Sequence, residues 1–150
     1  MLEARNRIRG WELRLAETLS QHAEAPFAWG QCDCLTLVGD VVEALIGTDP
    51  MADWRGRYGS AKAARDLLGA QGYADVQEAL AARFEPVAPS LARRGDIGIV
   101  ETRAGRRIVP GAVIVTGVNV VGKSAPARGS AVGLTTLARD RLIAAYRVGW

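Results

Sequence analysis

Residues 29–40 read Trp-Gly-Gln-Cys-Asp-Cys-Leu-Thr-Leu-Val-Gly-Asp and place a cysteine where a loop turns into a helix. The opening Trp-Gly pair predicts a turn, and Asp33 is a residue type that caps helices by accepting a backbone N–H of the first turn. After Asp33, apolar residues recur at the spacing of one helix face, which predicts a helix from Cys34 to about Ile46, ended by Gly47. The apolar positions are Cys34, Leu37, Val38, Val41 and Leu45.

The predicted position of Cys34 is typical of a cysteine hydrolase. A thiol at a helix N-terminus lies at the positive end of the helix dipole, which favours the thiolate, the nucleophilic form of cysteine. Asp33 is the charged residue next to it. Two interpretations of Cys34 stay open, a reactive nucleophile and the vestige of one. For Cys32 we expect only a small buried apolar residue.

The chain has one histidine, His22, which precedes Cys34 and continues the apolar stripe of a predicted helix, Trp11–Ala23. At the end of that helix, a histidine interacts with the last carbonyl groups or with the helix dipole, and we favour this interpretation. The alternative is a relocated general base for Cys34, because catalytic triads occur in several chain orders on unrelated folds.

The segment Trp29–Val38 resembles the start of the catalytic core in NlpC/P60 cell-wall peptidases, an aromatic-Trp-Gly turn followed by Asp-Cys-Ser-Gly-Leu-Val. It is most similar to the phage-encoded branch, where Cys-Asp-Cys-Leu-Gly-Leu-Val is common, with Thr36 here in place of Gly. The resemblance covers about residues 25 to 150 and implies that Cys34 occupies the nucleophile position. Shorter blocks that resemble the family are Arg94-Gly95-Asp96 with Ile97–Val100, Gly111–Gly117 and Leu142–Trp150.

The resemblance breaks down at the general base. In NlpC/P60 enzymes a histidine opens the strand that aligns with Gly111, and the polar residue that orients it aligns with about Gly122. Neither glycine can accept a proton. Loss of one member of such a catalytic unit typically lowers the rate by orders of magnitude. The alignment therefore implies a peptidase-like fold without its partner base, and weighs against an enzyme.

The 150 residues have the composition of one globular domain, with an N-terminal helical extension at 1–24 and a core at 25–150. No run approaches the roughly 18 apolar residues of a membrane helix, and there is no signal-peptide pattern, so we expect synthesis in a cytoplasm and no membrane partner. Two cysteines spaced i, i+2 with one histidine predict neither a disulfide framework nor a metal site, and we expect no cofactor.

Charge and short motifs exclude further classes. The net charge of +3 comes from arginines interleaved with acidic residues, which argues against nucleic-acid binding, and the basic arm Arg5–Arg14 is expected to be a solvated face. Gly117–Ser124 matches the P-loop spacing Gly-x-x-x-x-Gly-Lys-Ser, but Pro126 and Gly129 disfavour the helix that a P-loop requires. We interpret Arg94-Gly95-Asp96 as a turn before a strand, not as an integrin-type motif.

Helical patterns come first and strand patterns follow, which predicts an α+β domain. A helix that carries the nucleophile and packs on an antiparallel sheet is also the papain-like layout of NlpC/P60 proteins. The further helices are expected at Ala61–Ala70, capped by Ser60, and at about Ala74–Ala82; the strands are expected at Ile97–Glu101, Arg107–Val109, Ala112–Thr116, Val118–Val121 and Ile143–Val148. Gly122–Gly133 is predicted to be a mobile loop.

Three functions follow as hypotheses. The first, which we favour, is a structural or assembly component of a phage tail hub or tip, located in the virion and contacting other tail proteins through the loops Thr48–Gly59 and Gly122–Gly133. The second is an active cysteine peptidase or amidase that cleaves peptidoglycan stem peptides during phage entry, with Cys34 and Asp33 at its centre. The third is a thiol-dependent transferase acting on small substrates.

Overall fold

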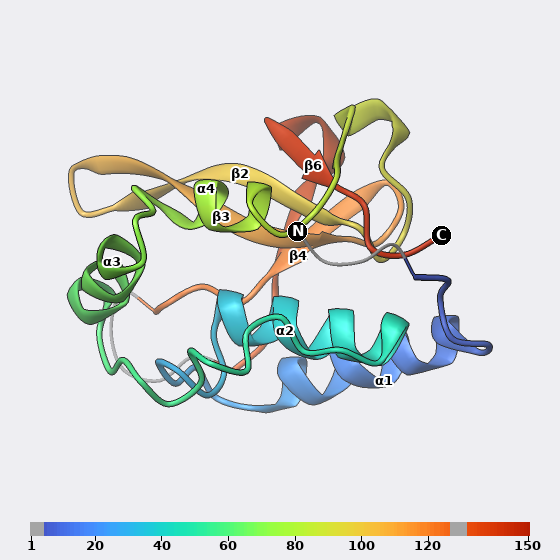
Figure 1. The fold of residues 1–150 in the computed structure, drawn as a ribbon, viewed down its shortest axis with the longest axis horizontal. Helices are drawn as coiled ribbons and strands as arrows, with labels where there is room; N and C mark the ends of the chain where they lie inside the picture. Colours follow the sequence, from blue (N-terminus) through green and yellow to red (C-terminus); the bar gives the residue numbers. More distant parts are fainter. Residues whose placement is uncertain (1–4, 127–131) are drawn as a thin grey trace.

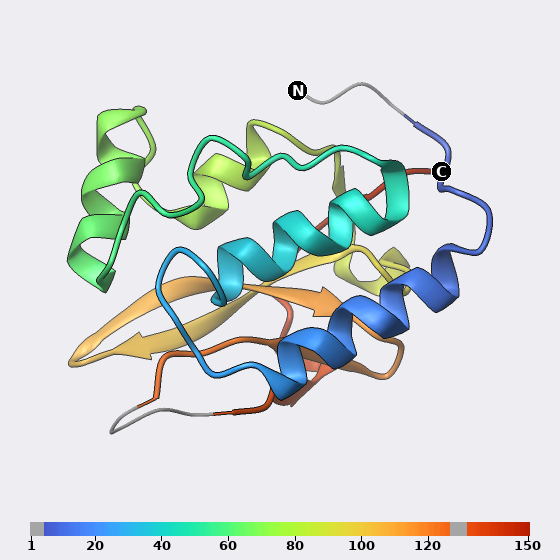
Figure 2. The same cartoon turned by 90° about the horizontal axis from the view of Figure 1, so that it is seen from below.

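The computed structural model describes residues 5–126 and 132–150, and this part of the chain forms four α-helices and a six-stranded antiparallel sheet. The helices α1 (Trp11–Glu24) and α2 (Cys34–Ile46) lie side by side over one face of the sheet (Figures 1 and 2). They are followed by α3 (Ala61–Ala70) and α4 (Val76–Ala81). Within the described ranges, no helix is both long and apolar enough to span a membrane.

The sheet has the strand order β1-β6-β2-β3-β4-β5. The last strand along the chain, β6, is therefore inserted between β1 and β2. Two short 3₁₀ turns, η1 (Pro89–Leu91) and η2 (Arg139–Arg141), connect its parts. The strands are β1 (Pro86–Val87), β2 (Ile97–Ala104), β3 (Arg107–Val115), β4 (Asn119–Gly122), β5 (Thr135–Ala138) and β6 (Ala144–Tyr146).

The predicted α+β class is confirmed, and the first three helices match their predicted bounds to within a residue. The strand predictions are less accurate. The two segments predicted around Pro110 form one continuous strand, β3, because the proline faces an edge where β4 does not pair with β3 and no amide hydrogen is required. The short strands β1 and β5 were not predicted. Residues 127–131 of the predicted loop Gly122–Gly133 lie outside the described residues.

The core is built around α2. This helix is apolar on nearly all sides because it lies between α1 and the sheet, and Leu37, Val38 and Leu45 are completely buried. The helix-facing surface of the sheet contributes Ile97, Ile99, Ala112, Ile114 and Val121 to the same cluster. A second, smaller cluster covers the opposite face and includes Val100 and Val113.

The ends of the described chain meet at Asp96, a completely buried carboxylate. Its oxygens accept hydrogen bonds from the Arg7 guanidinium at 3.0 Å, the Val148 amide at 3.0 Å and the Arg93 amide at 2.8 Å. The Arg7 and Trp150 backbones also join through an N–H···O bond of 3.2 Å. The expectation of a solvated basic arm is therefore wrong at Arg7, whose guanidinium is buried against Asp96. Asp96 also stabilises the predicted turn at residues 94–96 by accepting the Arg93 amide.

Lys123 is the largest completely enclosed side chain of the described residues. Its ammonium donates to the carbonyl oxygens of His22 at 2.8 Å, Ala25 at 2.6 Å and Gly133 at 3.0 Å. Two of these carbonyls lie at the end of α1, where backbone acceptors have no partner within the helix. The side chain thus ties the end of α1 to the segment after β4, a role that the P-loop spacing did not predict.

We predict that Lys123→Met lowers the free energy of unfolding by about 3 kcal/mol, because the methionine fills the space but leaves three buried carbonyls without their donor. Urea denaturation followed by circular dichroism measures the change. The matched control is Lys62→Met, at an exposed helix lysine paired only with Asp66, where we expect a change within about 0.5 kcal/mol. Equal effects of the two substitutions would contradict the assigned role.

Candidate functional site

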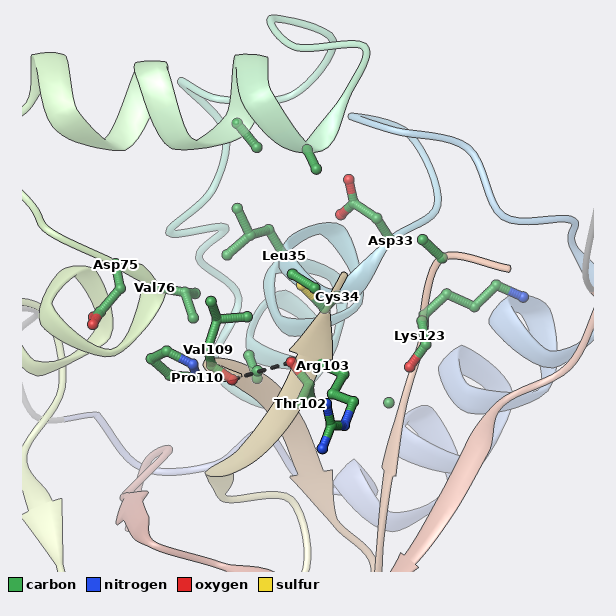
Figure 3. Close-up of a pocket in the computed structure, with 18 of the residues that line it drawn as sticks. Asp33, Cys34, Leu35, Asp75, Val76, Thr102, Arg103, Val109, Pro110 and Lys123 are labelled. Carbon is green, nitrogen blue, oxygen red and sulfur yellow. Dashed lines mark hydrogen bonds between the residues drawn. The ribbon is translucent and has the colours of Figure 1, made fainter. Parts of the chain in front are cut away.

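A groove of about 810 Å³ opens beside the N-terminus of α2. It lies between α2, α3, the start of α4 and the β2–β3 hairpin, and Cys34 and Leu35 line it in the centre (Figure 3). Thr102 and Val109 line it on the hairpin side, and Arg65 lines it from α3. The expected nucleophile position therefore does face a cavity large enough for a peptide segment.

The thiol of Cys34 is not activated. Burial raises its pKa to about 12, the neighbouring Asp33 carboxylate adds to this rise, and backbone N–H groups of Ala112 and of the helix start oppose it. The expected effect of the helix N-terminus is therefore present, but desolvation and a like charge outweigh it. At neutral pH, Cys34 is a neutral thiol.

Asp33 has a structural role at this site. Its Oδ1 accepts the Thr36 amide at 3.0 Å, and the Thr36 hydroxyl in turn accepts the Asp33 amide at 2.8 Å, so the two residues form a capping box. Its Oδ2 accepts the Gly30 amide and the Tyr58 hydroxyl, both at 2.7 Å. The carboxylate is fully used and buried, and it fixes the loop before α2.

On β3, the residue that faces Cys34 lies one position after Gly111, the residue chosen by the alignment. Gly111 pairs with Val100, and a Cβ at Gly111 would lie 2.6 Å from Cγ2 of Thr102, on the face of the sheet that points away from α2. Ala112 is the residue that packs toward α2, and its backbone hydrogen-bonds to the Cys34 thiol. The residue of β3 that faces α2 is therefore Ala112, which, like Gly111, cannot accept a proton.

The next strand shows the same shift. A Cβ at Gly122 would lie 3.2 Å from Cγ1 of Val113, which belongs to the cluster on the far face. Because side chains alternate along a strand, Lys123 is the residue on the helix-facing side. Figure 3 shows its side chain extending away from Cys34, in agreement with its bonds to α1. It therefore neither orients nor replaces a base for Cys34.

His22 is buried and is not the base for Cys34. Its Nε2 lies 2.6 Å from Oδ2 of Asp40, and its Nδ1 lies 3.6 Å from Sγ of Cys32. Both ring nitrogens are thus engaged, which overturns the relocated-base alternative. The favoured interpretation, in which the ring interacts with the last carbonyl groups of α1 or with the helix dipole, is incomplete as well. The imidazole contacts Asp40 and Cys32, and the ammonium of Lys123 is the group that binds the His22 carbonyl.

Sequence reasoning missed Asp40 and Arg55. The Asp40 carboxylate lies between His22 and Arg55, whose Nη2 is 2.5 Å from Oδ1, and Arg55 also binds Asp49 at 2.6 Å. Burial opposes the ionisation of Asp40, but the bonds from His22 and Arg55 outweigh it and hold the pKa of Asp40 below its usual range. The only available signal was the helical position of Asp40, on a different face of α2 from the apolar stripe.

The described residues contain no group of three or more His, Cys, Asp or Glu side chains placed to hold a metal ion. A family model described as a domain of unknown function, DUF6950, matches residues 6–148. The chain belongs to the DUF6950 family. No curated protein and no solved structure matched it. The matched range of this DUF6950 domain includes α1, the groove and all six strands.

We predict that iodoacetamide alkylates Cys34 very slowly at pH 8. With a pKa of about 12 in place of the usual value of about 8.5, the thiolate fraction is roughly a thousand-fold smaller. Peptide mass spectrometry over pH 7 to 9.5 measures the rate at this residue, which should rise about tenfold per pH unit. A plateau within that range would show an activated thiol and contradict the assignment.

We further predict opposite effects of Asp33→Asn on reactivity and on stability. Removal of the negative charge lowers the pKa of Cys34, so its alkylation becomes faster. The fold loses about 1–2 kcal/mol, because the asparagine amide has one acceptor oxygen in place of two, so its NH₂ group must face either the Thr36 amide or the Gly30 amide. Ser60→Ala, which removes the cap of α3, is the control: it should be destabilising by about 1 kcal/mol without any change at Cys34.

Proposed function

We propose that this DUF6950 domain is a non-hydrolytic component of a phage tail hub or tip, in which a degenerate papain-like, NlpC/P60-type fold serves as a docking module. The arrangement that supports the family resemblance is the cysteine at the N-terminus of α2, packed on an antiparallel sheet. In this proposal the domain retains a groove for a partner segment but does not hydrolyse a bond.

One observation carries the proposal, namely the state of Cys34. Its thiol is protonated at neutral pH, and the strand residue that packs toward it is Ala112. The one imidazole of the chain is committed to Asp40 and Cys32. A thiol nucleophile needs a base that accepts its proton and later an acid that protonates the leaving amine, and no side chain of residues 5–126 and 132–150 fills either role at Cys34.

The groove and the β2–β3 hairpin form the surface that we assign to docking. The hairpin tip extends beyond α1 and α2, toward the side of the molecule on which α3 lies (Figure 2), and it exposes Arg103, Arg106, Arg107 and Ile108. Opposite charges favour association, so the partner segment should carry carboxylates. The loop 48–59, which is also expected to contact partners, buries Met51, Trp54 and Tyr58 in the core, and its exposed residues are small or polar.

The alternative function, an active peptidoglycan peptidase or amidase, is favoured by a single feature, which is that Cys34 lines the groove. Peptidoglycan is then the partner of the groove in place of a tail protein. The two functions differ in whether a bond is cleaved, and one assay distinguishes them.

We predict that the purified protein releases no muropeptides from peptidoglycan, and that Cys34→Ala gives the same result, since no base contacts the thiol in the part of the chain that the structure describes. Liquid chromatography with mass spectrometry measures the release. Cleavage by the wild type that disappears in Cys34→Ala would reject the docking proposal and establish the peptidase. In the phage that encodes the domain, mass spectrometry of purified virions should detect the chain in the tail fraction.

A charge reversal tests the docking surface in the same phage. Arg107→Glu at the hairpin tip should lower incorporation into virions at least severalfold, because it repels an acidic partner segment. The matched control is Arg141→Glu, an exposed arginine on η2 that lies outside the groove and should leave incorporation unchanged. Equal incorporation of both variants would reject this surface.

A further inference from the structure

Cys32, His22 and Asp40 form a hydrogen-bonded chain that is separate from the groove. Sγ of Cys32 lies 3.6 Å from Nδ1 of His22, and Nε2 of the same ring lies 2.6 Å from Oδ2 of Asp40. None of the three residues lines the groove, whereas Cys34 does. The connectivity of thiol, imidazole and carboxylate is the one that cysteine nucleophiles use for activation.

The carboxylate determines where the protons are. Asp40 is ionised and binds the Arg55 guanidinium, so it can only accept a hydrogen bond from the imidazole. Nε2 of His22 therefore carries the hydrogen of the neutral ring, and Nδ1 has the free lone pair. That lone pair faces Sγ of Cys32, so the thiol donates its proton toward a base.

The ion pairs around Asp40 keep this arrangement in place. Arg55 bridges Asp40 and Asp49 with contacts of 2.5 and 2.6 Å, and it links the helix α2 to the loop that follows it. An imidazolium formed at His22 would lie directly against the Asp40 carboxylate. The Asp40 carboxylate thus lies where it pairs with the positive charge that deprotonation of Cys32 by His22 creates.

We propose that Cys32 is the reactive thiol of this protein and that His22 is its base. The site would be modified by small neutral electrophiles of the peroxide class, such as hydrogen peroxide. Only 8% of the Cys32 surface is exposed, which restricts the site to small reagents. Asp40 positions the imidazole. This inference does not depend on the docking function, because it concerns a different site.

Burial raises the pKa of Cys32, and the Asp33 and Asp40 charges add to this rise while Lys123 opposes it. The thiolate is therefore formed only as the proton moves to His22 during the reaction. The sulfur attacks one peroxide oxygen, an S–O bond forms and the O–O bond breaks. His22 passes the proton to the leaving hydroxide, which gives water. Cys32 is oxidised by two electrons to the sulfenic acid, and the peroxide is reduced.

The test compares the two cysteines in the same molecule. The folded wild-type protein is treated with hydrogen peroxide for timed intervals and then unfolded in the presence of dimedone, which traps the sulfenic acid. A second sample is treated with iodoacetamide, and peptide mass spectrometry with fragmentation follows Cys32 and Cys34. We expect Cys32 to react at least about tenfold faster than Cys34, and the ratio to approach one in 6 M guanidinium, where the network is lost. Faster reaction of Cys34, or equal rates in the folded protein, would overturn the proposal.

Two variants test the role of His22. His22→Gln can still bond to Asp40 but cannot take a proton, so the rate at Cys32 should fall at least about tenfold. Thr18→Val is the control on the same helix, since the Thr18 hydroxyl bonds only within α1, to the Arg14 carbonyl, and the ratio should not change. If circular dichroism shows that His22→Gln is unfolded, Asp40→Asn replaces it and should slow Cys32 severalfold. An unchanged rate in the folded variant would reject His22 as the base.

Discussion

The rest of the structure depends on the buried carboxylate of Asp33. It starts α2 through a capping box with Thr36 and fixes the preceding loop through Gly30 and Tyr58. The helix that it starts is the centre of the core, between α1 and the sheet. The same negative charge lies beside Cys34 and disfavours the thiolate there. The Asp33 charge therefore stabilises the fold and at the same time makes Cys34 a poorer nucleophile.

The two cysteines show how environment sets the chemistry of a thiol. Cys34 has the position in sequence and on the helix that is associated with catalysis, but its surroundings are a carboxylate, a desolvated helix start and an alanine. Cys32 lies two residues earlier, where the sequence gives no reason to expect reactivity, and it contacts an imidazole held by a carboxylate. Partners from α1 and α2 decide the difference, and neither partner adjoins a cysteine in sequence.

Local signals predicted the helices well, because Asp33, Ser60 and Gly47 act within a few residues of the helix ends that they define. The α+β class followed from the same patterns. The candidate site was less predictable. A one-residue offset in strand register exchanges the two faces of a sheet, so the alignment chose Gly111 where Ala112 faces the helix. The contact of His22 with Asp40 and the burial of Lys123 depend on the packing of distant segments, which spacing alone does not encode.

The two ends of the described chain meet at Asp96, which has a consequence for the architecture of larger proteins. Arg5 and Arg7 bond to the Trp150 backbone beside the C-terminal end of α2, while the groove lies at the N-terminal end of that helix, about 20 Å away (Figure 2). Entry and exit at a single edge allow a domain to be inserted into a loop of a host protein or joined in tandem without distortion. Such a fusion would leave the groove on the outward side.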